Sequence, residues 1–299
     1  SGRINNIQKI SFASDGDATD AADLIAQIGG STGGGSGTHG YHIGGTNPGP
    51  TENANASIEK FPYAVEENSV DTTNDFSTHI RFANREMIGD RTNIYVAGGT
   101  TNSVPAGLLI QQISKFSAAS DGSTIEDHGD LQTSLDYNHM TGHSSDTHGY
   151  MSGGYASTPG YSNMIEKWPF ASAANSSDVG DLQYADYGMA GTSSANHGYT
   201  SGGGGAGPPN YYRNNIMKFA FASDGNATDV GDKNAINMYQ VGASSADDGY
   251  VSGGFGGPGG GGPTNGQTYI FKYSHSSDGN STDIGNLAAQ NHQGSGTQN

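Results

Sequence analysis

The sequence predicts an all-β protein that contains six tandem copies of one four-stranded antiparallel unit, each about fifty residues long. Three observations support this prediction: a lysine recurs at a nearly constant interval, an apolar segment ending in Gly-Gly usually precedes it, and an Asp-Gly pair often follows it. The intervals between consecutive lysines are 51, 55, 52, 51 and 54 residues. These lysines are Lys9, Lys60, Lys115, Lys167, Lys218 and Lys272.

The unit divides into four short strands, most clearly around Trp168. Residues 187–194 form a first strand of small residues, 197–203 a second strand ending in a double glycine, 163–170 a third and 177–182 a fourth. Asp224 and Gly225 mark the turn between a third and a fourth strand, where a tight hairpin requires positive φ. The double glycine lets a strand end bend and lets backbones approach closely.

A crowded inner strand of small residues in a four-stranded repeat is typical of a β-propeller blade. We therefore expect residues 1–299 to form one β-propeller domain of six four-stranded antiparallel blades. Ser1 and Gly2 align with the Ser-Gly of a second strand, and residues 294–299 align with a first strand. Both termini should therefore close one blade, whose second strand is missing or truncated. The repeats cover approximately residues 1–45, 46–99, 100–154, 155–203, 204–254 and 255–299.

The strand that ends in Gly-Gly, followed by a strand with glutamate and an aromatic residue, resembles the kelch family. The first motif is GYHIGG ending at Gly45, IYVAGG at Gly99, GYMSGG at Gly154, GYTSGG at Gly203 and GYVSGG at Gly254. IEKF at Ile58 and IEKW at Ile165 match the second motif, whereas Asp-Val-Gly or Asp-Ile-Gly replaces the family's tryptophan in the fourth strand. The consensus of the repeats, SDGNATDVGDL followed by HGYxSGG, also resembles repeat proteins of marine bacteriophage virions and tails. Both resemblances imply a fold more than a function.

Composition restricts the partners and the location of the protein. The formal net charge of −17 opposes binding to nucleic acid phosphates, which requires clustered Lys and Arg. The chain has no cysteine, no apolar stretch long enough to span a membrane and no signal segment at its N-terminus. We expect a virion or extracellular location, with a host surface glycan or protein and other virion or surface proteins as partners.

An acid follows each repeat lysine by eleven residues, which suggests a structural ion pair across the Asp-Gly hairpin. A catalytic or ligand-binding interpretation would give six identical sites, so we expect a buried pair between blades with the lysine stem on aromatic rings. The expected pairs are Lys60 with Asp71, Lys115 with Glu126, Lys167 with Asp178, and Lys218 with Asp229.

No catalytic residues and no resident cofactor are predicted. His139 and His143 are spaced to share one face of an inner strand, which makes a metal at the hub conceivable, but turn histidines explain the ten histidines more simply. The Asp-Gly turns resemble calcium loops while lacking the glycine and glutamate of an EF-hand, so hairpin turns are favoured over calcium.

The connections between second and third strands vary most and carry the candidate ligand-binding residues. Tyrosine and glycine on loops of a rigid scaffold suit adaptable recognition, and we expect these aromatic rings to be substantially exposed. Ordinary variable loops are the alternative. The candidates are Tyr155, Tyr161, Tyr211, Tyr212, Arg213 and Phe255, with Tyr137, Tyr184, Tyr187 and Tyr239 added by the connections between blades.

The second repeat departs most from the others, because it has lost the DVGDL segment and gained Arg81, Arg85 and Arg91. Three of five arginines in an acidic chain suggest an edge that docks a partner. The function that fits best is a non-catalytic binding or structural propeller, a phage tail or appendage component that contacts a host surface glycan or protein. The alternatives are an extracellular glycan-active enzyme of propeller fold and a plain structural spacer.

Overall fold

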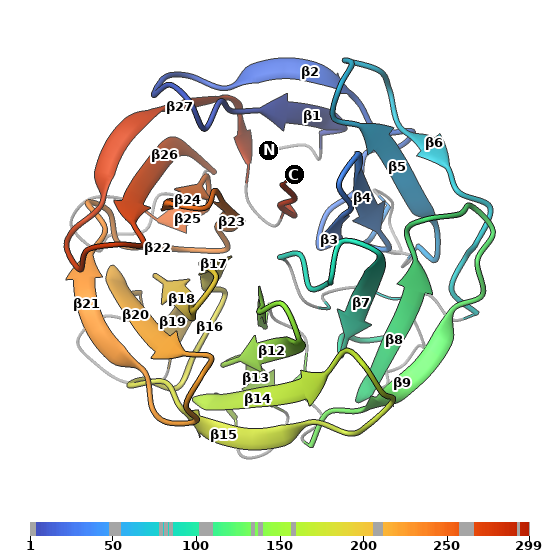
Figure 1. Ribbon diagram of the computed structural model, residues 1–299. Coiled ribbons are helices and arrows are strands. Elements are labelled where there is room, and N and C mark those ends of the chain that lie inside the picture. The colour runs from blue at the N-terminus through green and yellow to red at the C-terminus, as the bar shows by residue number, and fades with distance from the viewer. Residues whose placement is uncertain are drawn as a thin grey trace.

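The computed structural model describes residues 4–47, 55–77, 80, 83, 86–101, 110–132, 135–136, 140–156, 160–205, 212–256, 266–291 and 294–298. Over these residues the protein is a β-propeller without helices, and its antiparallel sheets stand around a central axis (Figure 1). Five sheets are blades, of which four have four strands and one has three. The predicted all-β propeller of antiparallel blades is confirmed, but there are five blades and not six, and four of the five have the expected four strands.

The first strand of each complete blade lies nearest the axis and the fourth lies at the rim (Figure 1). Blade 1 consists of β3 (Thr32–Gly35), β4 (His39–Ile43), β5 (Ile58–Pro62) and β6 (Val70–Asp71). Blade 2 consists of β7 (Asn93–Ala97), β8 (Gln112–Ser117) and β9 (Glu126–Asp130), and blade 3 of β11 (Thr141–Ser144), β12 (His148–Ser152), β14 (Met164–Pro169) and β15 (Ser177–Asp181). Blade 4 consists of β17 (Ala190–Ser193), β18 (His197–Ser201), β20 (Asn215–Ala220) and β21 (Thr228–Asp232), and blade 5 of β23 (Val241–Ser244), β24 (Asp248–Ser252), β26 (Gln267–Ser274) and β27 (Thr282–Asn291).

The sixth repeat forms only part of a blade, which we call the sixth position. Its sheet contains β1 (Asn6–Lys9) and β2 (Thr19–Asp23), and residues 294–298 lie on its axial side. The hydroxyl of Thr297 donates to the carbonyl of Gly34 at 2.6 Å, and the Gln298 side chain accepts from the amide of Ser244 at 3.4 Å. The C-terminal segment therefore lies between blades 5 and 1 at the hub, as the predicted closure by both termini requires; Gly2, the other residue of that prediction, is outside the described residues.

Glycine residues let the inner strands approach one another closely at the hub. A Cβ on Gly191 would lie 2.6 Å from the carbonyl oxygen of Gly142, and a Cβ on Gly242 would overlap the backbone of Gly191 in the same way. A Cβ on Gly296 would likewise overlap the backbone of Gly242, and a Cβ on Gly33 would overlap the backbone of Gly296. Residues 294–298 thus complete the ring of inner strands.

The hydrophobic core lies between blades and not in one central cluster. The largest buried side chains come from second and third strands and pack against the next blade, with Trp168 fully buried between blades 2 and 3. The tyrosine of a second strand stacks on an aromatic ring of the following blade, as Tyr150 does on Phe221 with ring centroids 4.7 Å apart. Each blade therefore depends on its neighbour for burial of its apolar face.

Fourth strands are joined by one repeated hydrogen bond. An Asn side-chain oxygen in the turn of one blade accepts the backbone N–H of the preceding fourth strand, for example from Asp181 to Asn226 at 3.0 Å. At the sixth position Asp17 takes this role for Asn286 at 2.8 Å, and Asn68 accepts from Asp23 at 3.0 Å. The rim is therefore continuous through the sixth position.

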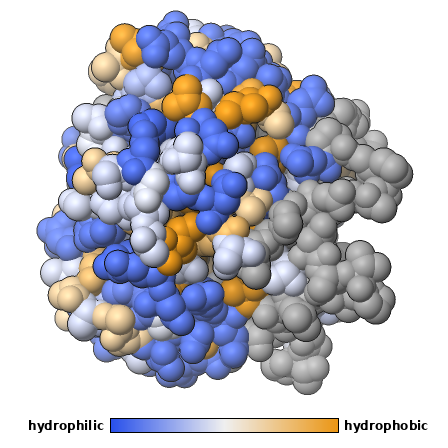
Figure 2. Space-filling model, turned by 90° about the vertical axis from the view of Figure 1, so that its right-hand side faces the viewer, coloured by the Kyte–Doolittle hydropathy of each residue, from blue (hydrophilic) through white to orange (hydrophobic). Residues whose placement is uncertain are grey.

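The second repeat has the weakest rim strand. β6 contains two residues, whereas β15 and β21 contain five each, because the DVGDL segment is absent there. On its axial side, blade 2 has a single isolated bridge between Gly89 and Ile94 in place of a first strand, among the residues described. The expected first strand of blade 2 is therefore reduced to this bridge. The rim of blades 1 and 2 is largely hydrophilic, with small apolar patches (Figure 2).

Candidate functional site

The connections between second and third strands meet the connections between blades on one face of the ring. Small two-stranded sheets form there, because each inner hairpin continues beyond the bend at its double glycine, where Gly202 and Gly203 have φ of 68° and 93°. These sheets pair β10 (Leu135–Asp136) with β13 (Tyr155–Ala156), β16 (Asp186–Tyr187) with β19 (Gly204–Gly205), and β22 (Asn237–Met238) with β25 (Phe255–Gly256).

Four tyrosines gather on this face, and we call them the tyrosine cluster: Tyr155, Tyr161, Tyr187 and Tyr239. The rings of Tyr155 and Tyr161 meet edge to face at 5.2 Å, and Tyr161 stacks on Tyr187 at 5.2 Å with an interplanar angle of 23°. The ring of Tyr239 meets Tyr187 at 5.9 Å. The cluster therefore extends over blades 3, 4 and 5.

The cluster combines half-buried rings with hydroxyl groups. Burial raises the pKa of the Tyr187 hydroxyl, and its hydrogen bond with Tyr239 opposes that rise. The expected substantial exposure is wrong for Tyr155, Tyr161, Tyr212 and Phe255, whose side chains are only partly exposed; the rings of Tyr155 and Tyr161 cover each other edge to face. Flat aromatic surface edged by hydroxyls can bind both apolar and polar parts of a ligand.

A buried carboxylate supports the loop beside the cluster. Asp186 is fully buried and accepts a hydrogen bond from Nε of Arg213 at 2.6 Å. The guanidinium carbon of Arg213 also lies 4.0 Å from the ring centroid of Tyr184. Burial raises the pKa of Asp186, and the positive charge of Arg213 opposes that rise. Arg213, predicted as a ligand contact, is thus held by two protein groups.

The remaining predicted ligand residues are dispersed. Tyr212 is partly exposed and bridges to Gly204, which places it at the edge of the small sheet of blade 4. Phe255 pairs with Met238 and Gly266 on blade 5. Tyr211 and Tyr137 lie outside the described residues.

The structure describes one of the three arginines predicted to dock a partner. Arg91 is exposed in a turn with φ of 68°, next to Asp90, whose carboxylate accepts the backbone N–H groups of Thr92 and Asn93. Arg81 and Arg85 lie outside the described residues. Docking at this edge stays a prediction.

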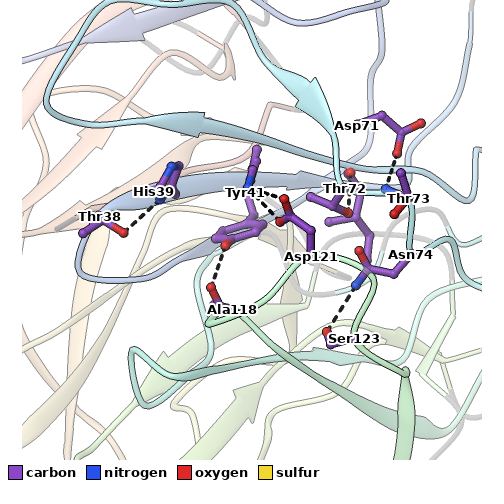
Figure 3. Close-up of polar contacts among 12 residues, drawn as sticks. Thr38, His39, Tyr41, Asp71, Thr72, Thr73, Asn74, Ala118, Asp121 and Ser123 are labelled. Carbon is purple, nitrogen blue, oxygen red and sulfur yellow. Dashed lines mark hydrogen bonds and ion pairs between the residues drawn. The ribbon is translucent and has the colours of Figure 1, made fainter.

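The expected ion pairs across the hairpin are wrong for Lys60, Lys167 and Lys218. Each of these lysines instead reaches the Asp-Gly turn of the next blade; Lys60 binds Asp121 at 2.6 Å, and Lys167 binds Asp224 at 2.9 Å. Figure 3 shows Asp121 close to Tyr41, while Asp71 turns toward the backbone of Thr73. Lys218 binds Asp278 in the same manner.

The cause is the pairing of the third strand with the fourth strand, which is shifted by one residue from the register that the eleven-residue spacing suggested. Thr228 lies opposite Lys218, so Asp229 lies opposite Met217 and points to the other face of the sheet. Asp178 and Asp71 are displaced in the same way. Blade 2 is the exception, because Glu126 lies directly opposite Lys115 and the two ions are 3.2 Å apart. The pair is not buried as expected, since the Glu126 side chain is exposed.

His143 and the acidic turns bind groups of the protein itself, while His139, the other residue of the predicted hub pair, lies outside the described residues. His143 is buried at the hub, with Nδ1 at 3.2 Å from the carbonyl of Thr192 and Nε2 at 3.0 Å from the hydroxyl of Ser152; burial lowers its pKa to about 4. Asp15 binds Lys272, and Asp17 binds the backbone of Asn286. Among the described residues, no three acidic or histidine side chains come together as a metal site would require.

One buried group was missed in the sequence. Lys233 stands where the preceding repeats have Leu131 and Leu182, and its side chain is almost fully buried. Its Nζ donates to Oδ1 of Asn237 at 2.6 Å and to the side-chain oxygen of Gln240. The change from DVGDL to DVGDK was the signal that could have identified it.

The chain matches no model of a known protein family, and no curated protein is significantly similar to it. In the part that the structure describes, no helix has the length and hydrophobicity needed to cross a membrane.

Proposed function

We propose that the protein is a non-catalytic binding propeller, a component of a virion or another extracellular particle, that contacts a glycan or protein on a host surface. The kelch-like and phage-like repeat motifs are part of this proposal. The tyrosine cluster carries it, because three successive blades bring four rings together on the face where the variable connections meet.

The backbone of Tyr239 supports a role for its ring in binding. Its φ of 59° lies in the left-handed region, which disfavours residues other than glycine by roughly 1–2 kcal/mol. Blade 4 has Gly188 at the equivalent place, with φ of 67°. The fold therefore accommodates a strained tyrosine beside Tyr187 where glycine would fit without strain, and strained residues of this kind concentrate at functional sites.

The partners of the nearby ionisable groups favour binding over catalysis. Asp186 is held by Arg213, and Arg213 in turn stacks on Tyr184, so this charge pair positions the loop. A glycosidase would require two carboxyl groups about 5–10 Å apart facing a sugar. The tyrosine cluster instead offers apolar rings with hydroxyl groups, which suit the faces and edges of sugar rings or a loop of a partner.

The test is replacement of two central rings. Because aromatic anchors dominate such contacts, Tyr161→Ala with Tyr187→Ala should weaken binding to a glycan array or to host cells by about tenfold or more. Binding is measured by array fluorescence and by sedimentation with cells, and folding by thermal unfolding. Tyr269→Ala is the matched control, since Tyr269 is also partly buried and stacks on one ring, Phe271, away from the cluster.

Full binding by the double variant would contradict the proposal. Attachment that survives it but is lost when Arg81, Arg85 and Arg91 are changed to alanine would place the binding site on the second repeat instead.

A further inference from the structure

The charged side chains of this acidic chain are distributed unevenly between the two faces of the ring. In an antiparallel blade, the turns that join the first strand to the second and the third to the fourth lie on the face opposite the tyrosine cluster. In each of the five blades, an exposed carboxylate lies in one of these turns. These residues are Glu66, Asp121, Asp146, Asp224 and Asp247. That face is therefore acidic, in keeping with the formal net charge of −17.

The connections that carry the tyrosine cluster, or lie beside it, have a very different composition. Four of these segments contain no Asp, Glu, Lys or Arg, although such residues make up 14% of the chain. The four segments are residues 155–163, 204–212, 234–240 and 255–266. The sequence of blades 3, 4 and 5 thus separates a charged face from a face of tyrosine, glycine and amide residues.

The charged residues next to these segments, Asp186 and Arg213, neutralise each other. Nε of Arg213 donates to the Asp186 carboxylate at 2.6 Å, the Asp186 side chain is fully buried, and the guanidinium of Arg213 lies over Tyr184. Opposite unit charges at this distance leave only a small field for a ligand outside. A further acid, Asp136 in the connection before blade 3, pairs with Tyr155 through its backbone, and the experiment below therefore includes it.

The rings and hydroxyl groups of the cluster are themselves uncharged. Burial raises the pKa of Tyr187 above its ordinary value of about 10, so its hydroxyl keeps its proton at neutral pH and can both donate and accept a hydrogen bond. A site for an ammonium group needs ring faces that are open to the cation. Tyr161 and Tyr187 instead stack at 5.2 Å with an angle of 23°, so each ring covers a face of the other. What remains for a ligand is apolar ring surface with hydroxyl groups at its edge.

We infer that the ligand of the tyrosine cluster is an uncharged saccharide built of neutral hexose units. The apolar C–H face of a hexose packs on the tyrosine rings, and its hydroxyl groups bond to the tyrosine hydroxyls. An anionic glycan is repelled by the acidic chain and finds Arg213 already paired, and a cationic one finds Asp186 buried. The inference rests on the binding function proposed above and narrows its ligand to one chemical class.

The experiment applies the full chain to a glycan array that carries neutral, sialylated, sulfated, phosphorylated and amino-sugar glycans. We expect the bound glycans to be neutral. The dissociation constant of the best neutral oligosaccharide, measured by calorimetry, should change less than about twofold between about 50 and about 500 mM sodium chloride, because salt screens interactions between charges. Binding of an anionic ligand to this acidic chain would strengthen with salt, and binding of a cationic ligand would weaken.

Tyr239→Gly tests the contact with little effect on folding. Glycine adopts the φ of 59° at this position without strain, as Gly188 does in blade 4, so the variant loses the ring and keeps the turn. Affinity for the neutral oligosaccharide should fall about tenfold, while the midpoint of thermal unfolding stays close to that of the natural chain. Thr73→Gly is the matched control and should bind normally, because Thr73 also has a left-handed φ, 63°, and lies beside the turn of blade 2 at Gly122. Asp136→Asn should likewise leave the affinity unchanged.

Preference for sialylated, sulfated, phosphorylated or amino-sugar glycans, or a clear change of affinity with salt or with Asp136→Asn, would overturn the assignment. An array without any bound glycan would overturn it as well. If Tyr161→Ala with Tyr187→Ala then still abolishes attachment to cells, the proposed binding function stands, with a protein as the ligand. Equal binding of neutral glycans by this double variant would overturn the site itself, and with it the proposed function.

Discussion

Blades 4 and 5 are built alike, yet the contact that each forms with the preceding blade, which we call a seam, is apolar for blade 4 and polar for blade 5. In the connection from blade 3 to blade 4, Leu182 and Met189 are buried against the double glycine of blade 3, at Gly153. In the connection from blade 4 to blade 5, Lys233 and Gln240 take the same two places against Gly202 of blade 4. The same backbone thus accepts a buried apolar pair in one seam and a buried amine with two amide oxygens in the next.

The difference shows that the residues of the polar seam depend on one another and differ as a group from those of the apolar seam. Nζ of Lys233 donates to the side-chain oxygens of Asn237 and Gln240, and Asn237 in turn donates to the carbonyl of Gly253 at 3.3 Å. Blade 4 has Asp186, bound by Arg213, at the place of Asn237. A buried cation is costly unless oxygen acceptors are fixed around it, so Lys233 depends on residues that the other seams lack.

The largest expected effect comes from moving the lysine to the apolar seam. Leu182→Lys should lower the free energy of unfolding by about 3–5 kcal/mol, because Met189 offers no oxygen to the buried ammonium and the carboxylate of Asp186, at the place of Asn237, is already bound by Arg213. Urea denaturation measures the loss. Leu182→Met is the control and should cost less than about 1.5 kcal/mol. A loss below about 1 kcal/mol for Leu182→Lys would mean that the seam itself, and not its amides, tolerates the charge.

The contrast between these seams also shows what could be predicted from the sequence. The strands, the Asp-Gly turns and the double glycines depend on residues close together in the chain, so the repeat alone indicated the blades. The partner of each lysine lies in the next blade, as Asp224 does for Lys167, and a spacing within one repeat contains no such information. The register that turns Asp178 away from Lys167 differs by one residue from the register expected.

The candidate site was predictable only in part, for a similar reason. Tyr155 and Tyr161 were identified because they lie in one variable connection. Their contacts with Tyr187 and then Tyr239 join three blades, and these depend on how the blades are rotated about the axis.

A smaller effect is expected when the polar seam is made apolar. Lys233→Leu combined with Gln240→Met should leave the protein equally stable or raise its free energy of unfolding by about 1–4 kcal/mol, as replacement of buried charged groups often does. Lys233→Leu alone should be less stable than the double variant, because the oxygens of Asn237 and Gln240 lose their donor. Urea denaturation of the single and double variants gives the coupling between the two positions. Additive effects would show that the two residues are not one unit.

The smallest expected effect is a pH dependence that distinguishes the two seams. Burial holds the pKa of Lys233 well below its usual value, while in the unfolded chain it is about 10.4. Between these two values the unfolded state binds the proton and the folded state does not, so the free energy of unfolding should rise with pH, by at most about 1.4 kcal/mol per pH unit for one proton. Measurements belong between pH 7 and about 9.5, because unfolded tyrosines ionise near pH 10 whereas burial raises the pKa of Tyr150 to about 12, which lowers stability above that range.

Urea denaturation at several pH values should therefore give a rising profile for the natural chain and a flatter one for Lys233→Leu with Gln240→Met, which contains only the apolar pair. The difference between the two profiles isolates Lys233, since other groups titrate alike in both proteins. Identical profiles would show that Lys233 keeps its proton in the fold. In that case the amide oxygens of Asn237 and Gln240 stabilise a full positive charge, and the polar seam would be a site of buried cation binding and not of a neutral amine.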